Sequence, residues 1–189
     1  MKSKLNKLDV ASRQLDAAIE LMFKGGDIVS VHTLGAASAR IFADLLQHIE
    51  VESWRMKIAS TFPGSEKQVL ERMNEAQNFF KHADRDPNAI LEFDEIQNDE
   101  LLIIATLECA EYLRQRETKG RKLSFTSSLF QIWYLAKSPV SLELSKHEMG
   151  EQIVEYSSQL FPRLSVMPRF RQLEEGAKSL KRDLVEIRA

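Results

Sequence analysis

Cysteine is almost absent from this sequence, and its scarcity excludes two kinds of site. Cys109 is the only cysteine among 189 residues, so the chain forms neither an internal disulfide nor a cysteine-based zinc site. Long apolar runs are lacking too, since the strongest one, LLIIA at 101–105, is far shorter than the ~20 residues that span a bilayer. No apolar stretch follows the first lysines, which indicates no signal peptide. We therefore expect a cytoplasmic protein with no membrane segment.

Glycine, proline and an excess of one charge are also scarce. The seven glycines and five prolines mostly stand where helices should end. A net charge of −2 gives the whole molecule no basic field that would draw it onto nucleic acid. The composition, 43% apolar and 29% charged, is typical of a globular protein, and the length suits a single domain over residues 1–189.

Apolar periodicity and capping signals predict an all-α fold. Asp27 follows the break FKGGD and can cap a helix, while Ser65 and Gln68 have the spacing of a capping box. No alternating strand pattern extends beyond a few residues. We expect long helices over 8–23, 28–49, 66–82 and 99–116, a continuation or short separate helix over 52–60, and further helices over 124–136, 141–161 and 168–187.

Two of these helices have the pattern of a bundle core. The helix over 28–49 carries an apolar stripe of Ile28, Val31, Leu34, Ile41, Leu45 and Ile49. Beside it lies a small-residue face that lets another helix approach closely, made of Gly35, Ala36, Ala39 and Ala43. Residues 100–113 are apolar on nearly every side, as in a buried helix. We expect a helical bundle of about four to five core helices over 8–116, with C-terminal helices over 124–187 packed on it or serving a homodimer.

Several apolar side chains outside that core also need partners. The last helix has one apolar side, which must pack on the same chain or on another, and consists of Phe170, Leu173, Leu180 and Leu184. Aromatic residues at helical spacing are expected to fill the core, namely Trp54, Phe125, Phe130 and Trp133. Cys109 lies in an apolar helix, where a small core residue is expected rather than a nucleophile.

The stretch NEAQNFFKHADRDP, residues 74–87, is the best candidate for a functional site. A helical wheel predicts one buried stripe, formed by Val69, Met73, Ala76 and Phe80. Asn78 and His82 fall on the opposite side as i, i+4 neighbours, so they can act together. A structural interpretation stays open, because a histidine in the last turn complements the helix dipole and the aspartates that follow are ordinary turn residues.

NFFKH within this stretch resembles the core of the HEPN superfamily motif. The resemblance implies a helical bundle that often dimerises and, in many members, metal-independent ribonuclease activity, with an arginine on the scissile phosphate and a histidine handling the proton. Imidazole suits that role because it titrates near neutral pH. Asn78 matches the polar position and His82 the histidine, but Gln77 stands where the arginine should be. Glutamine lacks the charge and the fork of guanidinium, so Arg85, or less well Arg72, is the candidate replacement.

A second resemblance covers more of the chain, roughly residues 15–113. The order AAIELMF, GDIVSVHTLGAASARIFADLL and NFFKHADRDP is similar to that of a group of bacterial helical proteins with no assigned activity. This likeness implies a single bundle and a cytoplasmic bacterial setting, and it implies no mechanism.

Charge is divided unevenly around the candidate motif. Between 84 and 111 one base, Arg85, stands against nine acids: Asp84, Asp86, Glu92, Asp94, Glu95, Asp99, Glu100, Glu108 and Glu111. Such a surface would repel a polyanion within a screening distance of about 8–10 Å. Residues 114–122 instead hold five bases, which form either a solvated helix end or a phosphate-contacting site: Arg114, Arg116, Lys119, Arg121 and Lys122.

Metal and cofactor sites have weaker support. His82, Asp84 and Asp86 form an H-x-D-x-D string that His32 could approach, and such ligands suit Mn, Fe or Zn. No HExxH or paired E-x-x-H pattern accompanies the string, so we expect no metal. His32 is expected to pack beside the alanine face or to bond to a neighbouring helix. Phosphate-loop, G-x-S-x-G and dinucleotide motifs are missing, and no cofactor is expected.

These patterns favour a small helical protein that acts by binding a protein, a nucleotide or a nucleic acid, as a homodimer and without catalysis. The alternative is a HEPN-like metal-independent ribonuclease or RNA-binding module that uses His82, Asn78 and Arg85. A metal-dependent bundle enzyme is the third hypothesis.

Overall fold

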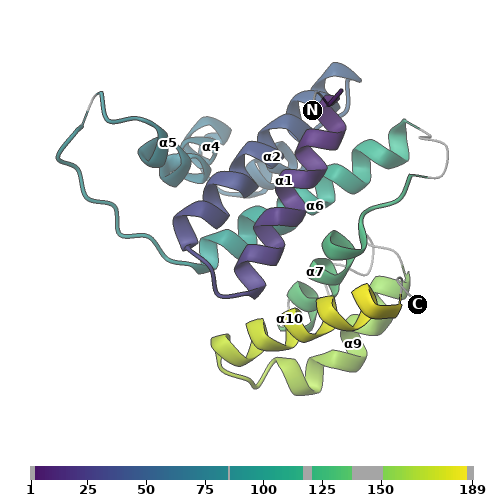
Figure 1. Cartoon of the computed structure of the whole chain (residues 1–189). Helices are drawn as coiled ribbons and strands as arrows, with labels where there is room; N and C mark the ends of the chain where they lie inside the picture. The colour runs from purple at the N-terminus through teal and green to yellow at the C-terminus, as the bar shows by residue number, and fades with distance from the viewer. Residues whose placement is uncertain (1–2, 85, 117–120, 138–150, 187–189) are drawn as a thin grey trace.

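The computed structural model describes residues 3–84, 86–116, 121–137 and 151–186, with every side chain in these ranges except those of Phe161 and residues 182–186. Within them the chain forms nine helices and no strand, which confirms the predicted all-α fold (Figure 1). In chain order the helices are α1 (Lys7–Phe23), α2 (Ile28–His48), α3 (Trp54–Thr61), α4 (Glu66–Met73), α5 (Glu75–Lys81), α6 (Ile96–Gln115), α7 (Phe125–Ala136), α9 (Glu151–Leu164) and α10 (Arg169–Glu186).

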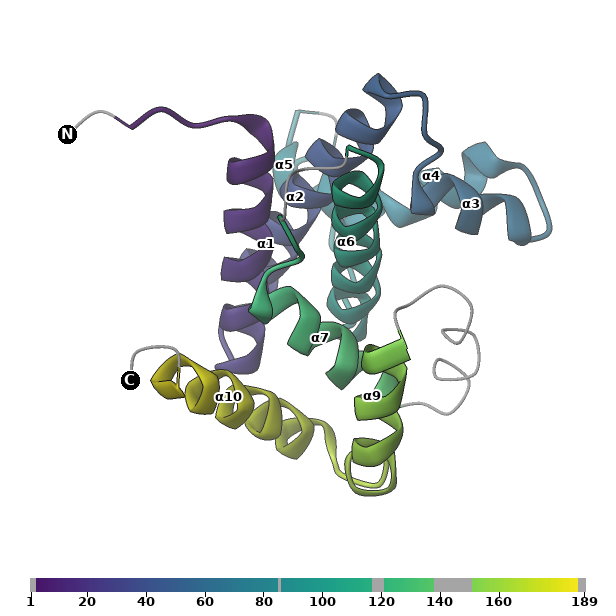
Figure 2. The ribbon, with the colours of Figure 1, turned by 90° about the vertical axis from the view of Figure 1, so that its right-hand side faces the viewer.

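Three long helices, α1, α2 and α6, make the centre of the bundle (Figures 1 and 2). The small-residue face of α2 lies against α6, and a Cβ on Gly35 would be only 3.0 Å from Leu102 Cδ2. The same face is completed by Phe42 and Leu46, which are fully buried. By contrast Ile28, in the predicted apolar stripe, is 38% exposed. Other members of that stripe do pack in the core, since Val31 is buried and Leu34, Ile41 and Leu45 contact the core cluster.

Side-chain caps fix most of the helix starts. Asp27 accepts a hydrogen bond from the amide of Ser30 at 2.8 Å, and Ser65 and Gln68 form the predicted capping box. The start of α6 lies three residues before the predicted 99; its N-cap Glu95 makes no side-chain cap, and the Asp94 carboxylate before it accepts from the amide of Ile96 at 2.9 Å. Local capping chemistry thus decides where these helices begin.

The predicted helix over 66–82 is wrong in one respect, because two short helices replace it. Asn74 ends α4 and begins α5, and its amide bonds to the carbonyls of Leu70 and Glu71 at 3.1 and 3.2 Å. Asparagine favours turns over helix interiors, and α4 buries no residue that would hold a continuous helix in place. The predicted polar face is correct, since Asn78 and His82 are exposed, whereas of the predicted buried stripe only Ala76 is buried and Val69, Met73 and Phe80 are half-buried.

The C-terminal helices pack on the bundle of the same chain (Figure 2). Phe23 of α1 contacts Phe130 and Trp133 of α7, with ring centroids 6.1 and 5.2 Å apart. The indole of Trp133 donates to the carbonyl of Gln172 on α10 at 2.8 Å. Arg169 of α10 makes two hydrogen bonds of 2.6 and 2.7 Å to the fully buried carboxylate of Asp99 on α6, which Lys137 also contacts.

The remaining core predictions have mixed outcomes. Phe130 and Trp133 are buried as predicted, whereas the prediction for Phe125 is wrong: it is the first residue of α7 and stays 38% exposed. On α10, Leu180 packs within the chain but Phe170 is 58% exposed, and the side chain of Leu184 lies outside the described residues. The predicted helix over 141–161 falls outside them up to residue 150, and α9 ends at 164. None of the described helices is both long enough and apolar enough to cross a membrane.

Candidate functional site

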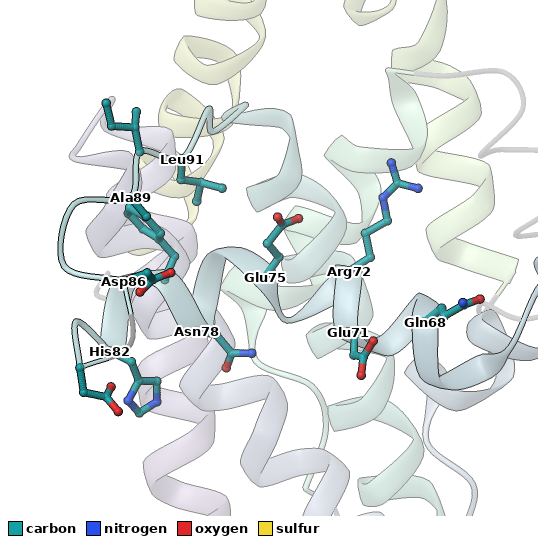
Figure 3. A pocket seen from close by; sticks show the side chains of 12 residues that line it. Gln68, Glu71, Arg72, Glu75, Asn78, His82, Asp86, Ala89 and Leu91 are labelled. Carbon is teal, nitrogen blue, oxygen red and sulfur yellow. The ribbon is translucent and has the colours of Figure 1, made fainter.

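The stretch 74–87 forms one side of an open concavity of about 930 Å³ between α4, α5 and the segment 86–91 (Figure 3). His82 caps the C-terminus of α5, where its amide bonds to the carbonyl of Asn78 at 3.1 Å. Both side chains are exposed and lie next to one another, as the wheel predicts. We call this hollow the α4–α5 concavity.

The lining of the α4–α5 concavity is acidic and partly apolar. Two basic side chains line it, Arg72 and His82. Four acidic side chains line it as well, and they are Glu71, Glu75, Asp84 and Asp86. The apolar part comes from Phe79, Ala89, Ile90 and Leu91. Ile90 is 93% exposed and adjoins these other apolar residues. The hollow therefore combines negative charge with an exposed apolar wall.

An aromatic cluster attaches this wall to the bundle. Phe80 and Phe93 place their rings edge-on to His32 of α2, with centroids 5.4 and 5.1 Å away, and contact each other at 5.3 Å. Asn98 donates through Nδ2 to the carbonyl of Ile28 at 3.0 Å, so its Oδ1 accepts from Nδ1–H of His32 at 3.0 Å. This bond to α6 confirms the expected role of His32.

The same geometry fixes the protonation state of His32. Its Nε2 is buried with no hydrogen-bond partner among the described residues. A second proton there would be a buried donor without an acceptor, and burial lowers the pKa of His32. His32 is therefore a neutral structural residue that carries the wall of the concavity.

The arginine needed for a HEPN-like site has no described replacement beside His82. Gln77 is half-buried on another face of α5. Arg72 lines the same concavity, but its guanidinium points away from His82 in Figure 3. Arg85 lies outside the described residues. The described geometry thus brings together Asn78 and His82, and the cation on the same turn is Lys81, not an arginine.

The predicted acidic surface needs one correction. Of the nine acids between 84 and 111, Asp99 and Glu108 are fully buried and contribute nothing to a surface field. Glu71 and Glu75 of α4 and α5 take their place around the concavity. The sequence-based prediction missed this grouping, although Glu71 and Asn78 lie on the same face of the helical wheel. It also missed Ile90 and Leu91, which stand out in the sequence as an apolar pair within an acidic connection.

Basic residues of 114–122 lie at the other end of α6. Phe80 contacts His32, which is bonded to Asn98 in the first turn of α6. Arg114 is in the last turn of this helix, about 24 Å from Asn98 along the helix axis. Arg114 bonds to Glu111 at 2.7 Å and Arg121 to Asp9 at 3.1 Å. Arg116 and Lys122 are exposed, and Lys119 lies outside the described residues. Internal carboxylates thus neutralise part of this basic run.

The metal and nucleophile hypotheses gain no geometric support from the described part of the chain. No group of three or more His, Cys, Asp or Glu side chains in it is arranged to hold a metal ion. His32 is turned toward Asn98 and does not join the string that begins at His82. Burial raises the pKa of the Cys109 thiol to about 12, so the thiolate that a nucleophile requires is not formed at neutral pH.

Fold and site together define an all-α helical protein with an open, acidic and partly apolar concavity on one side. Comparison of the chain with known protein families, with curated proteins and with solved structures gave no match. The likeness to the HEPN superfamily therefore stays a prediction that rests on Asn78 and His82.

Proposed function

We propose that the protein acts by binding, without catalysis, and that it takes a positively charged, partly apolar segment of a protein partner in the α4–α5 concavity. The observation that carries this proposal is the composition of the lining, four carboxylates beside an apolar wall that ends in Ile90. Complementary charge would steer a basic segment into the hollow and disfavour a polyanion.

The apolar wall supplies most of the affinity in this proposal. An isoleucine that goes from full exposure to burial gains about 1.5–3 kcal/mol, and Ile90 has nearly its whole surface available. Each exposed carboxylate contributes about 0.2–1 kcal/mol with a cation of the partner, and salt screens it. The carboxylates therefore act on partner choice and association rate, while Ile90 and Leu91 act as the anchor.

The test uses a short synthetic peptide of lysine and leucine, labelled for fluorescence anisotropy. Ile90→Ala should weaken its binding by about tenfold, and Glu75→Gln by about two- to fivefold. Glu155→Gln, an exposed carboxylate of α9 outside the concavity, is the matched control and should leave affinity unchanged. Equal affinity of the Ile90 and Glu75 variants and the wild type would contradict the proposal.

A HEPN-like ribonuclease that uses His82, Asn78 and Arg85 is the second candidate. One observation favours it, namely that Asn78 and His82 are exposed side by side on a concavity that Arg72 also lines. In that case His82→Ala abolishes RNA cleavage, while the free energy of unfolding of the protein changes by no more than about 1 kcal/mol. Gln77→Arg should raise the cleavage rate, and a chelator should have no effect. Cleavage that both variants leave unchanged would exclude this candidate.

RNA contact through the basic run is part of the same second candidate. Arg116 and Lys122 are its exposed members without a described carboxylate partner, whereas Arg114 and Arg121 are paired within the chain. Charge removal at Arg116 and Lys122 together should reduce RNA affinity and its salt dependence. RNA affinity that does not change would assign this run to a solvated helix end.

Self-association and a cytoplasmic location complete the proposal. A cytoplasmic setting is consistent with one cysteine whose thiol is buried. For a homodimer, exposed apolar side chains lie on α9, in the turn after it and at the start of α10, and they are Tyr156, Leu160, Val166 and Phe170. Light scattering of wild type and Phe170→Ser tests this part, and a wild type that is monomeric at every concentration would overturn it.

A further inference from the structure

A second cavity of about 410 Å³ lies away from the α4–α5 concavity, between the end of α2, α3 and α4. Gln47 and Val51 line it from the end of α2 and the segment after it, Met56 from α3, and Leu70 from α4. Its volume falls in the range typical of small-molecule sites. The cavity thus has room for a small ligand, and its charged groups determine which kind fits.

Arg55 is the unusual residue of this cavity. It lines the hollow although it is only 9% exposed, and its Nε has no hydrogen-bond partner among the described residues. Its backbone amide faces Oε1 of Glu108 at 3.5 Å, while Oε2 of that carboxylate is also unpartnered. Burial raises the pKa of Glu108 to about 7, so at neutral pH this acid compensates the guanidinium charge only in part. A buried cation without a full counter-charge is costly, and an anionic group in the cavity would relieve that cost.

The mouth of the cavity has the opposite charge. Glu50 and Glu52 are exposed there, whereas Asp44 is paired with Arg40 at 3.0 Å. Two carboxylates at the mouth, neither with a partner in the part of the chain that the structure describes, disfavour a ligand that is negative throughout. They favour one with an anionic end toward Arg55 and a cationic end toward solvent.

Glu50 stands at this mouth in a special backbone conformation. Its φ is +58°, the left-handed conformation that glycine adopts most readily after a helix. The amide of Val51 closes this helix end on the carbonyl of Leu46 at 3.0 Å. Glycine would fit this backbone better, so the carboxylate of Glu50 stands at a strained position.

From these observations we propose that the cavity binds a small zwitterion of the amino-acid type, with its carboxylate on the Arg55 guanidinium and its ammonium group beside Glu50 and Glu52. A planar guanidinium matches a carboxylate well. This binding site is separate from the α4–α5 concavity, and neither proposal depends on the other.

The test measures the thermal unfolding midpoint of the full chain with each of the common free amino acids. Acetate and methylammonium, which carry one half of the charge pattern each, serve as controls at equal ionic strength. At least one amino acid should raise the midpoint of the wild type more than both controls do, and titration calorimetry should then give its affinity. Arg55→Met should remove this effect, and Arg55→Lys, which keeps the charge but loses the fork, should weaken binding by about tenfold or more.

Glu50→Gly separates ligand binding from stability. Relief of the strained backbone should raise the midpoint of the free protein, while loss of a carboxylate should weaken amino-acid binding. If no amino acid exceeds the controls, the proposal is wrong. It is also wrong if the Arg55 variants bind as the wild type does, and where Arg55→Met does not fold, Arg55→Lys and Glu50→Gly decide.

Discussion

Replacing Gly176 of α10 with alanine sets two opposing effects against each other. In an ordinary helix interior, alanine is about 1 kcal/mol more favourable than glycine. Here an added Cβ would lie 2.4 Å from Cε1 and 2.5 Å from Cδ1 of Phe23, more than an ångström inside normal contact. The Phe23 ring is 2% exposed and packs against Trp133 and Phe130, so any movement that relieves the clash would disturb these ring contacts.

The clash should outweigh the gain in helix propensity. Overpacking typically costs about 1–3 kcal/mol, and a shift of α10 would also strain the bond from Trp133 to the carbonyl of Gln172. A clash this close belongs in the upper part of that range, about 2–3 kcal/mol, and helix propensity offsets about 1 kcal/mol of it, so we expect Gly176→Ala to lower the free energy of unfolding by about 1–2 kcal/mol, measured by urea titration and tryptophan fluorescence. In a double-mutant cycle, Phe23→Leu should make the alanine less costly. A Gly176→Ala protein as stable as the wild type would refute the close packing of α10 on α1.

Three further substitutions test buried charged or titratable groups, and a fourth, at an exposed carboxylate, is a control. Burial lowers the pKa of His32 in the folded state, so its neutral form contributes stability that is complete above about pH 6.5 and is lost as the pH falls below that value. His32→Gln should remove this acid sensitivity of the free energy of unfolding in urea titrations. Glu108 has the opposite pH dependence, because its pKa is raised from 4.5 to about 7 in the folded protein, which therefore loses stability as the pH rises from 4.5 to 7. Above pH 7, Glu108→Gln should be more stable than the wild type by up to about 3 kcal/mol. Asp99→Asn should lower the free energy of unfolding by about 3–5 kcal/mol, because it leaves Arg169 without its buried partner. Glu95 is exposed and lies 3.8 Å from Nε of the same arginine, so Glu95→Gln should cost less than about 1 kcal/mol. Equal costs of the two substitutions would contradict this contrast.

Much of the secondary structure was predictable because its signals are local. Asp27 and the capping box at Ser65 mark helix starts within three residues of their partners, and the small-residue face of α2 is visible as a pattern. The break at Asn74 was missed because periodicity continues through it, so that only the weak burial of α4 reveals it. Phe125 was misplaced because helical spacing does not report that a residue stands at an exposed first turn.

Long-range contacts are what the sequence could not supply. Asp99 and Arg169 are 70 positions apart, and nothing in either segment indicates that one acid of an acidic stretch is buried against a C-terminal arginine. The candidate site was found in part, since the wheel placed Asn78 and His82 together on the surface. Its acidic and apolar lining depends on how α4 and the segment 86–91 meet, which local patterns do not determine.

The binding function proposed for the α4–α5 concavity is tested most directly by mapping where a partner binds. The isotope-labelled protein would be titrated with the lysine–leucine peptide, and separately with a single-stranded RNA oligonucleotide, while backbone amide shifts are followed by NMR. We expect the peptide to shift amides within 68–91 and to leave 114–122 unchanged, with no RNA binding in the concavity. Peptide-induced shifts confined to other parts of the chain, or RNA that binds at His82 more tightly than the peptide does, would contradict the proposed function.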